Sequence, residues 1–483
     1  MPELVEQSPR VRRKFHVALT PAQLIAFSFA GVIAAGTFLL YSPAATNGEP
    51  LRFIDAFFTA VSATCVTGLA VFDVSTRLSW FGQLVLLACI QIGGLGLMTL
   101  TTLFVAVFGG RMGVCDRLAI QESYHHSPTV AVRSLILHVT LATFVAEAVG
   151  AALLFTHWSL RGHLQDWTVR AYHAAFHSIS AFCNAGFTLY SDNMMGFAGD
   201  FFTQAILSGL VIAGGLGFLV SLDLRQYLWE TGLHSLPWLC RIVRQTPRRS
   251  RPRLSVHTKV VLSVTILLLL IGVVSYFLLE RRGVLAQMTT WQAWWNAWFC
   301  AVTARTAGFN TLDYAQMSGP ALMCTMALMF IGASPGSTGG GIKTSTFGIL
   351  VAHAIFRLRG RDRLHCFGRT IPEETIERAH AIVVSAIAVV VLAVSVVIEA
   401  ETQRYDAKQS RELFLPVLFE TISAFATVGL SMNLTPTLTT LGKFVIAVVM
   451  FVGRIGPLTV AVAVASRARQ EKFHYAEENI MVG

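Results

Sequence analysis

Eight apolar stretches, each long enough to cross a bilayer, recur along this 483-residue chain and constrain its fold more than any other feature. They lie at residues 18–42, 80–108, 133–156, 201–222, 258–279, 317–350 (with a Gly-rich interruption), 380–399 and 441–465. The chain is 54% hydrophobic and 13% charged, so it holds more apolar surface than a soluble core can cover. Backbone groups in lipid must be hydrogen-bonded within their own segment, so each stretch is predicted to be a helix. The sequence therefore predicts an all-α polytopic membrane protein.

The distribution of basic residues predicts how the chain is oriented. The segments 1–17, 109–133, 223–259, 343–380 and 467–483 hold about 25 of the 37 Lys and Arg residues, as expected for loops on the cytoplasmic side. Both termini are therefore expected in the cytoplasm, with a basic cytoplasmic loop at 229–256. We interpret the arginines between Arg241 and Arg253 as an anchor on anionic lipid headgroups, because no aromatic residues interleave them as in a nucleic-acid patch.

Four shorter segments, too short to span a bilayer, lie between successive pairs of long stretches and end at a glycine. These glycines are separated by 118, 122 and 121 residues and are Gly68, Gly186, Gly308 and Gly429. An aromatic residue stands ten positions before each of them: Phe58, Phe176, Trp298 and Phe419. A fixed period indicates an internal repeat. We predict four helix–pore-loop–helix repeats, and thus eight transmembrane helices around one central pore, at 18–108, 131–228, 257–356 and 379–466.

The four glycine loops are predicted to form a selectivity filter. Irregular backbone at membrane depth must be buried in protein or line water, and glycine lets successive carbonyls face a shared axis. Potassium channels dehydrate their ion with such carbonyls in a T-V-G core, which Thr427-Val428-Gly429 matches. A single glycine would more simply serve helix packing, but chance does not repeat the register four times. The predicted filter residues are Cys65, Val66, Thr67, Gly68, Asn184, Ala185, Gly186, Thr306, Ala307, Gly308, Thr427, Val428 and Gly429.

At these residues the chain resembles the ion-translocating membrane subunit of the Trk/Ktr/HKT potassium transporter superfamily, and most the bacterial Ktr type. The resemblance covers nearly the whole chain, through the phrases SATCVTG, SISAFCNAGFTLYSDN, TARTAGFNTLD, IGASPGSTGGGIKTST and the final GRIGPL. It implies potassium uptake across the cytoplasmic (inner) membrane, a homodimer with one pore per subunit, and a cytoplasmic nucleotide-binding regulatory subunit. It also implies that Gly68 bears on selectivity, since some plant members with serine there favour sodium.

A Gly-rich interruption of the sixth stretch is expected to be the gate that the resemblance implies, in the form of an intramembrane loop at 332–341 below the filter. Proline and glycine cannot continue the helix there, and a packed kink is the structural alternative. The stretch has one residue too many before its lysine for a phosphate-binding loop. The predicted gate residues are Gly332, Ser334, Pro335, Gly336, Ser337, Thr338, Gly339, Gly340, Gly341, Lys343 and Arg454.

Charged residues near the loops are predicted to have structural or electrostatic roles. Arg454 lies inside the last stretch, where it either opposes a cation below the filter or belongs to a structural ion pair. We expect Glu420 to be structural, at the start of a helix whose dipole favours a carboxylate. Acidic residues beside the loops could gather cations or form a solvated rim: Asp55, Asp73, Asp192 and Asp313.

The remaining function classes are less well supported by the sequence. No metalloprotease motif or nucleophile elbow is present, so an enzyme is not expected. A coupled small-solute carrier would predict inverted repeats and buried acids, whereas these repeats run parallel and acids such as Glu147 and Glu399 are few. A sodium-selective or weakly selective transporter of the same fold stays open, as does a sodium requirement. The chain is expected to hold no cofactor other than the transported or activating potassium and sodium ions.

Overall fold

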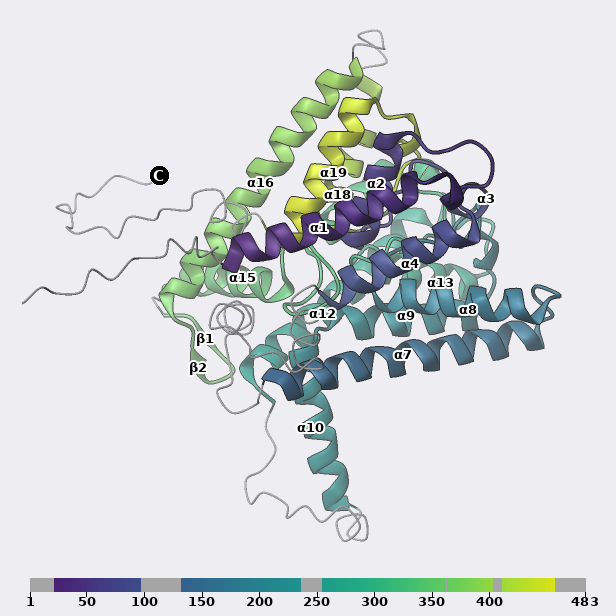
Figure 1. Cartoon of the computed structure of the whole chain (residues 1–483). Helices are drawn as coiled ribbons and strands as arrows, with labels where there is room; N and C mark the ends of the chain where they lie inside the picture. The colour runs from purple at the N-terminus through teal and green to yellow at the C-terminus, as the bar shows by residue number, and fades with distance from the viewer. Residues whose placement is uncertain (1–20, 97–131, 236–253, 362, 403–410, 457–483) are drawn as a thin grey trace, which may run out of the picture.

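The computed structural model describes residues 21–96, 132–235, 254–361, 363–402 and 411–456, which are mostly helical (Figure 1). The predicted tails at 1–17 and 467–483 lie outside the described residues, as does most of the basic loop at 229–256. The ends of the predicted stretches 80–108 and 441–465 also lie outside them.

The helices fall into four successive groups of similar build. Group 1 holds α1 (Pro21–Tyr41), α2 (Phe53–Thr64), the short α3 (Val74–Arg77) and α4 (Trp80–Leu95). Group 2 holds α7 (Val132–Leu160), α8 (Trp167–Phe182), α9 (Phe201–Gly215) and α10 (Phe218–Ser235). Group 3 holds α12 (Val256–Glu280), α13 (Thr290–Thr303), α14 (Gly319–Phe330) and α15 (Thr344–Leu358). Group 4 holds α16 (Glu373–Thr402), α18 (Phe414–Phe425) and α19 (Thr440–Ile455).

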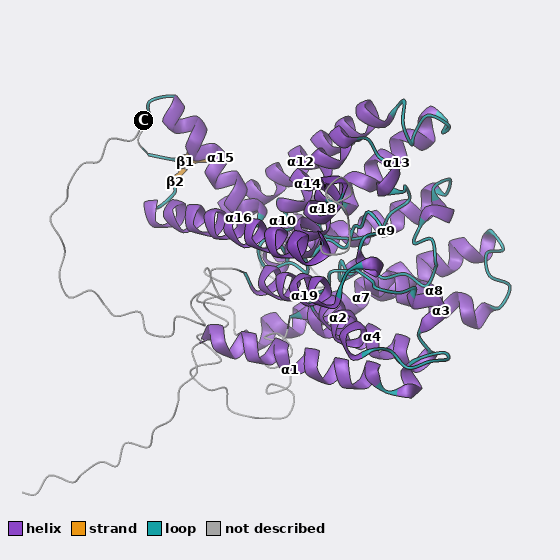
Figure 2. Cartoon of the chain, turned by 90° about the horizontal axis from the view of Figure 1, so that it is seen from above, coloured by secondary structure: helices purple, strands orange, loops and turns teal. Residues whose placement is uncertain are grey.

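Short elements complete the groups. The 3₁₀ turns are η1 (Pro43–Ala45), η2 (Met195–Phe197), η3 (Tyr314–Gln316) and η4 (Thr435–Thr437). Strands β1 (His365–Cys366) and β2 (Arg369–Thr370) pair antiparallel between α15 and α16. This hairpin lies at one end of the bundle, and the loop that joins α7 to α8 lies at the opposite end (Figures 1 and 2).

The groups pack around a closed circle. In each group the short helix that precedes the glycine loop, namely α2, α8, α13 or α18, packs against the first long helix of its own group. It also packs against the last core helix of the preceding group, in the pairs α4 with α8, α9 with α13, α14 with α18, and α19 with α2. An ion pair closes the circle between groups 4 and 1, because Lys443 Nζ donates to Asp55 Oδ1 at 2.7 Å.

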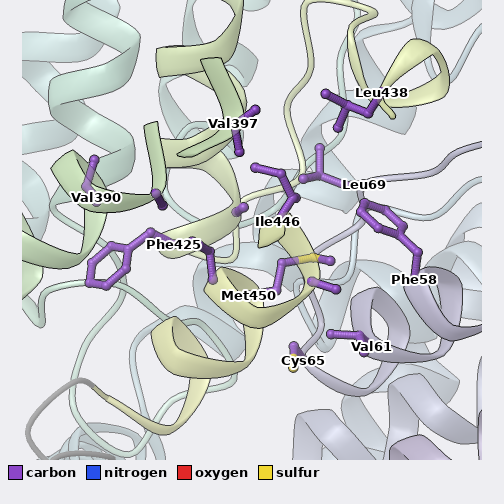
Figure 3. Packing of buried hydrophobic residues seen from close by; sticks show 14 of the residues in the cluster. Phe58, Val61, Cys65, Leu69, Val390, Val397, Phe425, Leu438, Ile446 and Met450 are labelled. Atoms are coloured by element: carbon purple, nitrogen blue, oxygen red, sulfur yellow. The ribbon is translucent and has the colours of Figure 1, made fainter. Parts of the chain in front are cut away.

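A buried apolar cluster fills the junction between groups 4 and 1. Ile446 and Met450 of α19 lie between Phe58 and Val61 of α2 on one side and Phe425 of α18 on the other (Figure 3). All of these side chains are at most 2% exposed. The aromatic residue ten positions before the glycine is thus a core residue in group 1, and Phe176 and Phe419 are fully buried as well.

The described helices match the predicted stretches unevenly. Val139–Leu160, Val256–Glu280 and Glu373–Thr402 are long and apolar enough to cross a membrane alone. Other predicted stretches contain shorter apolar helices. Helices α14 and α15 lie on either side of the predicted interruption in 317–350. The prediction of one helix over 201–222 is wrong, because α9 and α10 meet at a 103° bend. Gly217 adopts a φ of +84° at that bend, and Phe218 N–H donates to Gly336 O at 3.1 Å, outside the helix.

Side chains at the helix ends cap the helices and bond helices of the same group to each other. Ser79, Asp200 and Thr439 cap α4, α9 and α19 by accepting a backbone N–H of the first turn. In group 4, Glu401 Oε1 accepts from Thr439 N and Oγ1 at 2.8 and 2.7 Å, so α16 is bonded to the start of α19.

Group 3 contains the same arrangement. Glu280 of α12 accepts from Ser318 N and Oγ at 2.8 and 2.6 Å, at the start of α14. In group 2 the acidic residue lies at the start of the later helix instead. Asp200 at the start of α9 pairs with His157 of α7, whose Nε2 lies 2.8 Å from Asp200 Oδ2.

Candidate functional site

The four glycine loops share an unusual backbone. Each glycine has a positive φ, and so does the residue two positions before it, although that residue is never a glycine. The φ values of the earlier residues are +57° for Val66, +60° for Asn184, +71° for Thr306 and +50° for Thr427. Those of the glycines are +96° for Gly68, +67° for Gly186, +77° for Gly308 and +90° for Gly429. Alternating handedness turns successive peptide groups toward one side of the chain.

Adjacent loops touch through these glycines. A Cβ built on Gly68 would lie 2.5 Å from Ala185 O, one on Gly186 would lie 2.7 Å from Ala307 O, and one on Gly308 would lie 2.6 Å from Val428 O. A Cβ on Gly429 would collide with Thr67 O, which returns the contact to group 1. The four loops therefore form a closed ring, which we call the glycine ring, in which each glycine packs on the peptide that precedes the next glycine.

Serine hydroxyls hold three of the loops. The hydroxyl oxygen of Ser62 accepts the N–H of Gly68 at 3.1 Å, and that of Ser423 accepts the N–H of Gly429 at 3.1 Å. In group 2, Ser180 Oγ instead donates to Phe187 O at 2.8 Å. Val302 occupies this position in group 3, where the side chain has no polar atom to offer.

Asn184 of group 2 and Thr306 of group 3, each two positions before the glycine of its loop, bond to each other. With the Asn184 amide oriented so that its oxygen accepts from Thr306 Oγ1 at 3.2 Å, its nitrogen donates to Ala181 O and Val211 O at 3.1 and 3.2 Å. Cys65 and Cys183 are buried free thiols. Cys183 Sγ lies 3.7 Å from Glu147 Oε1, whose carboxylate also accepts from Gln91 Nε2 at 3.0 Å.

The Gly-rich loop between α14 and α15 packs against this ring. Ile331 and Ile342 pair at its base, and Ser334 N–H and Thr338 N–H donate to Gly215 O and Gly214 O at 3.1 and 3.3 Å. The segment is therefore anchored on the bend between α9 and α10.

The tip of the same loop lies directly against two residues of the ring. A Cβ on Gly340 would lie 2.9 Å from Thr427 Cγ2, and one on Gly339 would collide with Thr306 Oγ1. Thr338 Oγ1 also donates to Phe182 O at 3.3 Å. Residues 332–341, the predicted gate, thus lie against the glycine loops of groups 3 and 4.

Three basic side chains, of which Arg305 is buried and Lys343 and Arg454 are partly buried, surround this loop and donate to backbone carbonyls. Arg454 donates to Thr338 O and, at 2.5 Å, to Gly93 O. Lys343 Nζ donates to Gly339 O at 2.7 Å, within the loop itself. Neither forms an ion pair with a carboxylate in the described part of the chain, so an ion pair of Arg454 with a described acid, one of its two sequence readings, is not formed.

Arg305 is the third basic residue, and sequence reasoning missed it. It stands three positions before Gly308, is 8% exposed, and its Nη2 donates to Gly332 O at 3.3 Å. It therefore joins the glycine loop of group 3 to the start of the Gly-rich loop. A charge inside the apolar pore-loop segment was the available signal, because such charges are costly unless they meet polar groups.

The prediction for Glu420 is wrong in its position. Helix α18 begins at Phe414, so Glu420 is not in the first turn but in the middle of the helix, where it is 1% exposed. Its carboxylate accepts from Ser431 Oγ and, at 2.9 Å, from Thr435 Oγ1. The helix dipole is therefore not what holds this carboxylate.

Each of the four acidic residues beside the loops has a partner in the protein. Asp73, Asp192 and Asp313 accept the N–H groups of Ser75, Gly196 and Ala315 at 2.8, 2.8 and 3.0 Å, while Asp55 pairs with Lys443. Asp73, Asp192 and Asp313 therefore stabilise turns and helix starts, whereas Asp55 joins group 1 to group 4.

Comparison with known proteins gives the family. Residues 7–475 match the family model TrkH, described as cation transport protein. The chain is 38% identical to Ktr system potassium uptake protein B of Bacillus subtilis, over 97% of this chain and 98% of the relative. It is 38% identical to the protein of the same name from Vibrio alginolyticus, over 95% of this chain and 94% of that relative. It is 36% identical to potassium/sodium uptake protein NtpJ of Enterococcus hirae, over 98% of this chain and 99% of the relative.

A solved structure has the same fold. The crystal structure of the potassium transporter TrkH from Vibrio parahaemolyticus matches with a TM-score of 0.69 at 17% identity, over 93% of this chain and 86% of that one. The resemblance inferred from the loop sequences is thus confirmed. The chain belongs to the TrkH family of cation transport proteins, which are multi-pass membrane transporters and not enzymes.

Proposed function

We propose that this protein takes up potassium across the cytoplasmic membrane through one pore, with the glycine ring as its selectivity filter. The observation that carries this proposal is the ring itself, in which four loops with the same alternating φ pattern close on one another. Carbonyls aimed at a shared axis replace the water shell of a cation. The names of the relatives, potassium uptake protein B and potassium/sodium uptake protein, support the same ion class.

The composition of the ring favours moderate discrimination between potassium and sodium. Groups 2 and 3 have Asn184-Ala185 and Thr306-Ala307 where group 4 has Thr427-Val428. Asn184 and Thr306 bond to each other, so these two quadrants are held by side chains that a uniform potassium filter lacks. A sodium-selective or weakly selective transporter is therefore the second candidate, and the printed name of the Enterococcus relative supports it.

We also infer that residues 332–341 and Arg454 form the gate. The loop packs against Thr306 and Thr427, and Arg454 donates to a carbonyl of the loop and to Gly93 O of α4. A positive charge at this position repels a cation that leaves the filter. Opening requires the loop to move and its contacts with the bend between α9 and α10 to break.

The remaining parts of the proposal concern topology and assembly. The clustering of basic residues in alternate segments supports cytoplasmic termini. Two copies, each with its own pore, and a separate cytoplasmic nucleotide-binding subunit complete the assembly. The chain itself needs no cofactor apart from potassium and, in a sodium-dependent mechanism, sodium.

Growth of an uptake-deficient cell in low potassium, with and without sodium, tests the function. Cells that carry the parental gene are expected to grow. In cells that carry the Gly68→Ser variant, uptake is expected to lose its preference for potassium over sodium. Growth equal to that of the empty cell, with the protein present in the membrane, contradicts potassium uptake. Growth that requires sodium identifies a sodium-dependent mechanism.

A further inference from the structure

Glu420 is bonded to the segment that follows the filter glycine of group 4. It stands nine residues before Gly429 on α18, and its two carboxylate oxygens accept from Ser431 Oγ and Thr435 Oγ1. Ser431 Oγ in turn accepts Asn433 N–H at 2.9 Å. The helix that enters the loop and the segment that leaves it are thus joined behind the filter by one buried side chain.

His177 occupies the corresponding position of group 2, nine residues before Gly186. Its Nε2 accepts Leu189 N–H at 3.3 Å, so the segment after the glycine is again bonded to the helix before it. Its Nδ1 lies 2.7 Å from His173 O, and its ring stacks on Tyr190 with centroids 5.0 Å apart. His177 is 0% exposed and is held on both sides.

The other two groups lack this connection through the same position. Thr59 donates its hydroxyl to Asp55 O at 2.7 Å, one turn back in its own helix, and Phe299 has no polar side-chain atom. In the order of the glycine ring, groups 2 and 4 are not neighbours, so they lie opposite each other. The two joined quadrants therefore alternate with two quadrants that are not joined in this way.

We propose that Glu420 and His177 are positioning residues that brace two opposite filter loops and thereby help to set which cation the filter accepts. The proposal rests on the proposed function of the glycine ring as a filter. A filter prefers the larger ion only while its carbonyls resist closing around the smaller one, and a loop bonded to a buried side chain moves less than a free one. Loss of a brace leaves the loop free to adapt to sodium, so the preference falls although the pore remains.

The test compares brace variants with a matched control in reconstituted vesicles. Glu420→Leu removes both acceptors, His177→Phe keeps a ring but removes the acceptor for Leu189 N–H, and Glu420→Gln retains a polar side chain of the same shape. Thr59→Val changes the equivalent position of group 1, where the hydroxyl bonds only to its own helix. The measurement is the ratio of potassium to sodium permeability, with unfolding temperature and elution profile as folding checks.

We expect Glu420→Leu to lower this ratio about tenfold, which corresponds to about 1.4 kcal/mol of discrimination. His177→Phe lowers it as well, Glu420→Gln restores much of it, and Thr59→Val leaves it at the parental value. A merely structural carboxylate would lower the amount of folded protein and leave the ratio of the folded fraction unchanged.

Two results separate this inference from the proposed function. A parental protein that shows no selective cation flux refutes the function itself. A selective parent with parental ratios in both folded Glu420→Leu and His177→Phe overturns the brace alone, as does an equal loss of selectivity in Thr59→Val. Where Glu420→Leu does not fold, Thr435→Val, which removes one donor and leaves the bond to Ser431, takes its place under the same criteria.

Discussion

Replacing Gly68 with serine places a side chain at a close contact between two loops of the glycine ring. The backbone there has a φ of +96°, which costs a residue with a Cβ roughly 1–3 kcal/mol. The new Cβ would lie 2.5 Å from Ala185 O, so that oxygen has to move by about 0.9 Å to reach an ordinary contact of 3.4 Å. Because Ala185 belongs to the neighbouring loop, the substitution displaces a carbonyl of group 2 as well as its own.

The displaced carbonyl should weaken discrimination against sodium. A loss of one to two kcal/mol, similar to the strain, is a factor of about 5–30 in the ratio of potassium to sodium permeability. Uptake of a radioactive rubidium tracer into reconstituted vesicles, in competition with sodium, measures this ratio. Gly68→Ala gives the same steric effect without a hydroxyl, so it separates displacement from new coordination.

Gly48→Ser is the matched control for backbone strain. Gly48 also has a φ of +96°, but nothing lies within 4 Å of a Cβ built there. It therefore carries the same conformational cost without a contact in the ring. If folded Gly68→Ser protein keeps the parental selectivity, or if Gly48→Ser loses as much of it, the glycine ring is not the filter.

Arg454→Gln should raise cation flux in vesicles without the partner and leave selectivity unchanged. The reason is that a like charge about 6 Å away, at an effective dielectric of 20, repels a cation by roughly 3 kcal/mol. Flux at the parental level would mean that this arginine has only a structural role. The purified chain should bind no ATP or ADP in calorimetry, because its described residues form no nucleotide-binding domain, and tight stoichiometric binding would contradict this. Glu280→Ala and Glu401→Ala should each lower stability by roughly 1–3 kcal/mol, because each leaves partly buried donors without their acceptor. Glu374→Ala, which removes only an exposed pair with Arg378, should change stability by less than about 1 kcal/mol, and equal shifts in thermal unfolding would refute the difference.

The positions of the loops could be predicted from the sequence because the regular spacing of the glycines follows from a physical requirement on backbone inside a membrane. Polar backbone at membrane depth has to be gathered in one place, and only a repeated register achieves this. Gly68, Gly186, Gly308 and Gly429 do meet in one ring. Their roles in selectivity stay predictions until the permeability ratios are measured.

The left-handed backbone conformation of the residues two positions before the glycines could not be predicted from the sequence. Val66, Thr306 and Thr427 are β-branched, and such residues avoid positive φ unless the surrounding structure imposes it. The contacts of the closed ring, which join residues more than a hundred positions apart, impose it here. Local sequence preference points to the opposite conformation.

Two errors concern helix limits. The carboxylate of Glu420 was assigned to a helix start from its place in the sequence, but α18 begins six residues earlier. The stretch 201–222 is apolar throughout its middle, yet it breaks where Gly217 meets the Gly-rich loop. The Gly-rich loop that makes this contact is more than a hundred residues away in the sequence.

The closure of the glycine ring has a consequence for biogenesis. Gly429 packs on the peptide of Thr67, and Lys443 pairs with Asp55, so the first loop receives its last neighbour from the final part of the chain. During synthesis the first three loops enter the membrane with one side of the ring open, and their polar backbone there has no protein partner. The glycine ring therefore closes as a single late event rather than quadrant by quadrant. A ribosome that stops before group 4 leaves a product with unsatisfied backbone in lipid, which the cell's quality control can recognise.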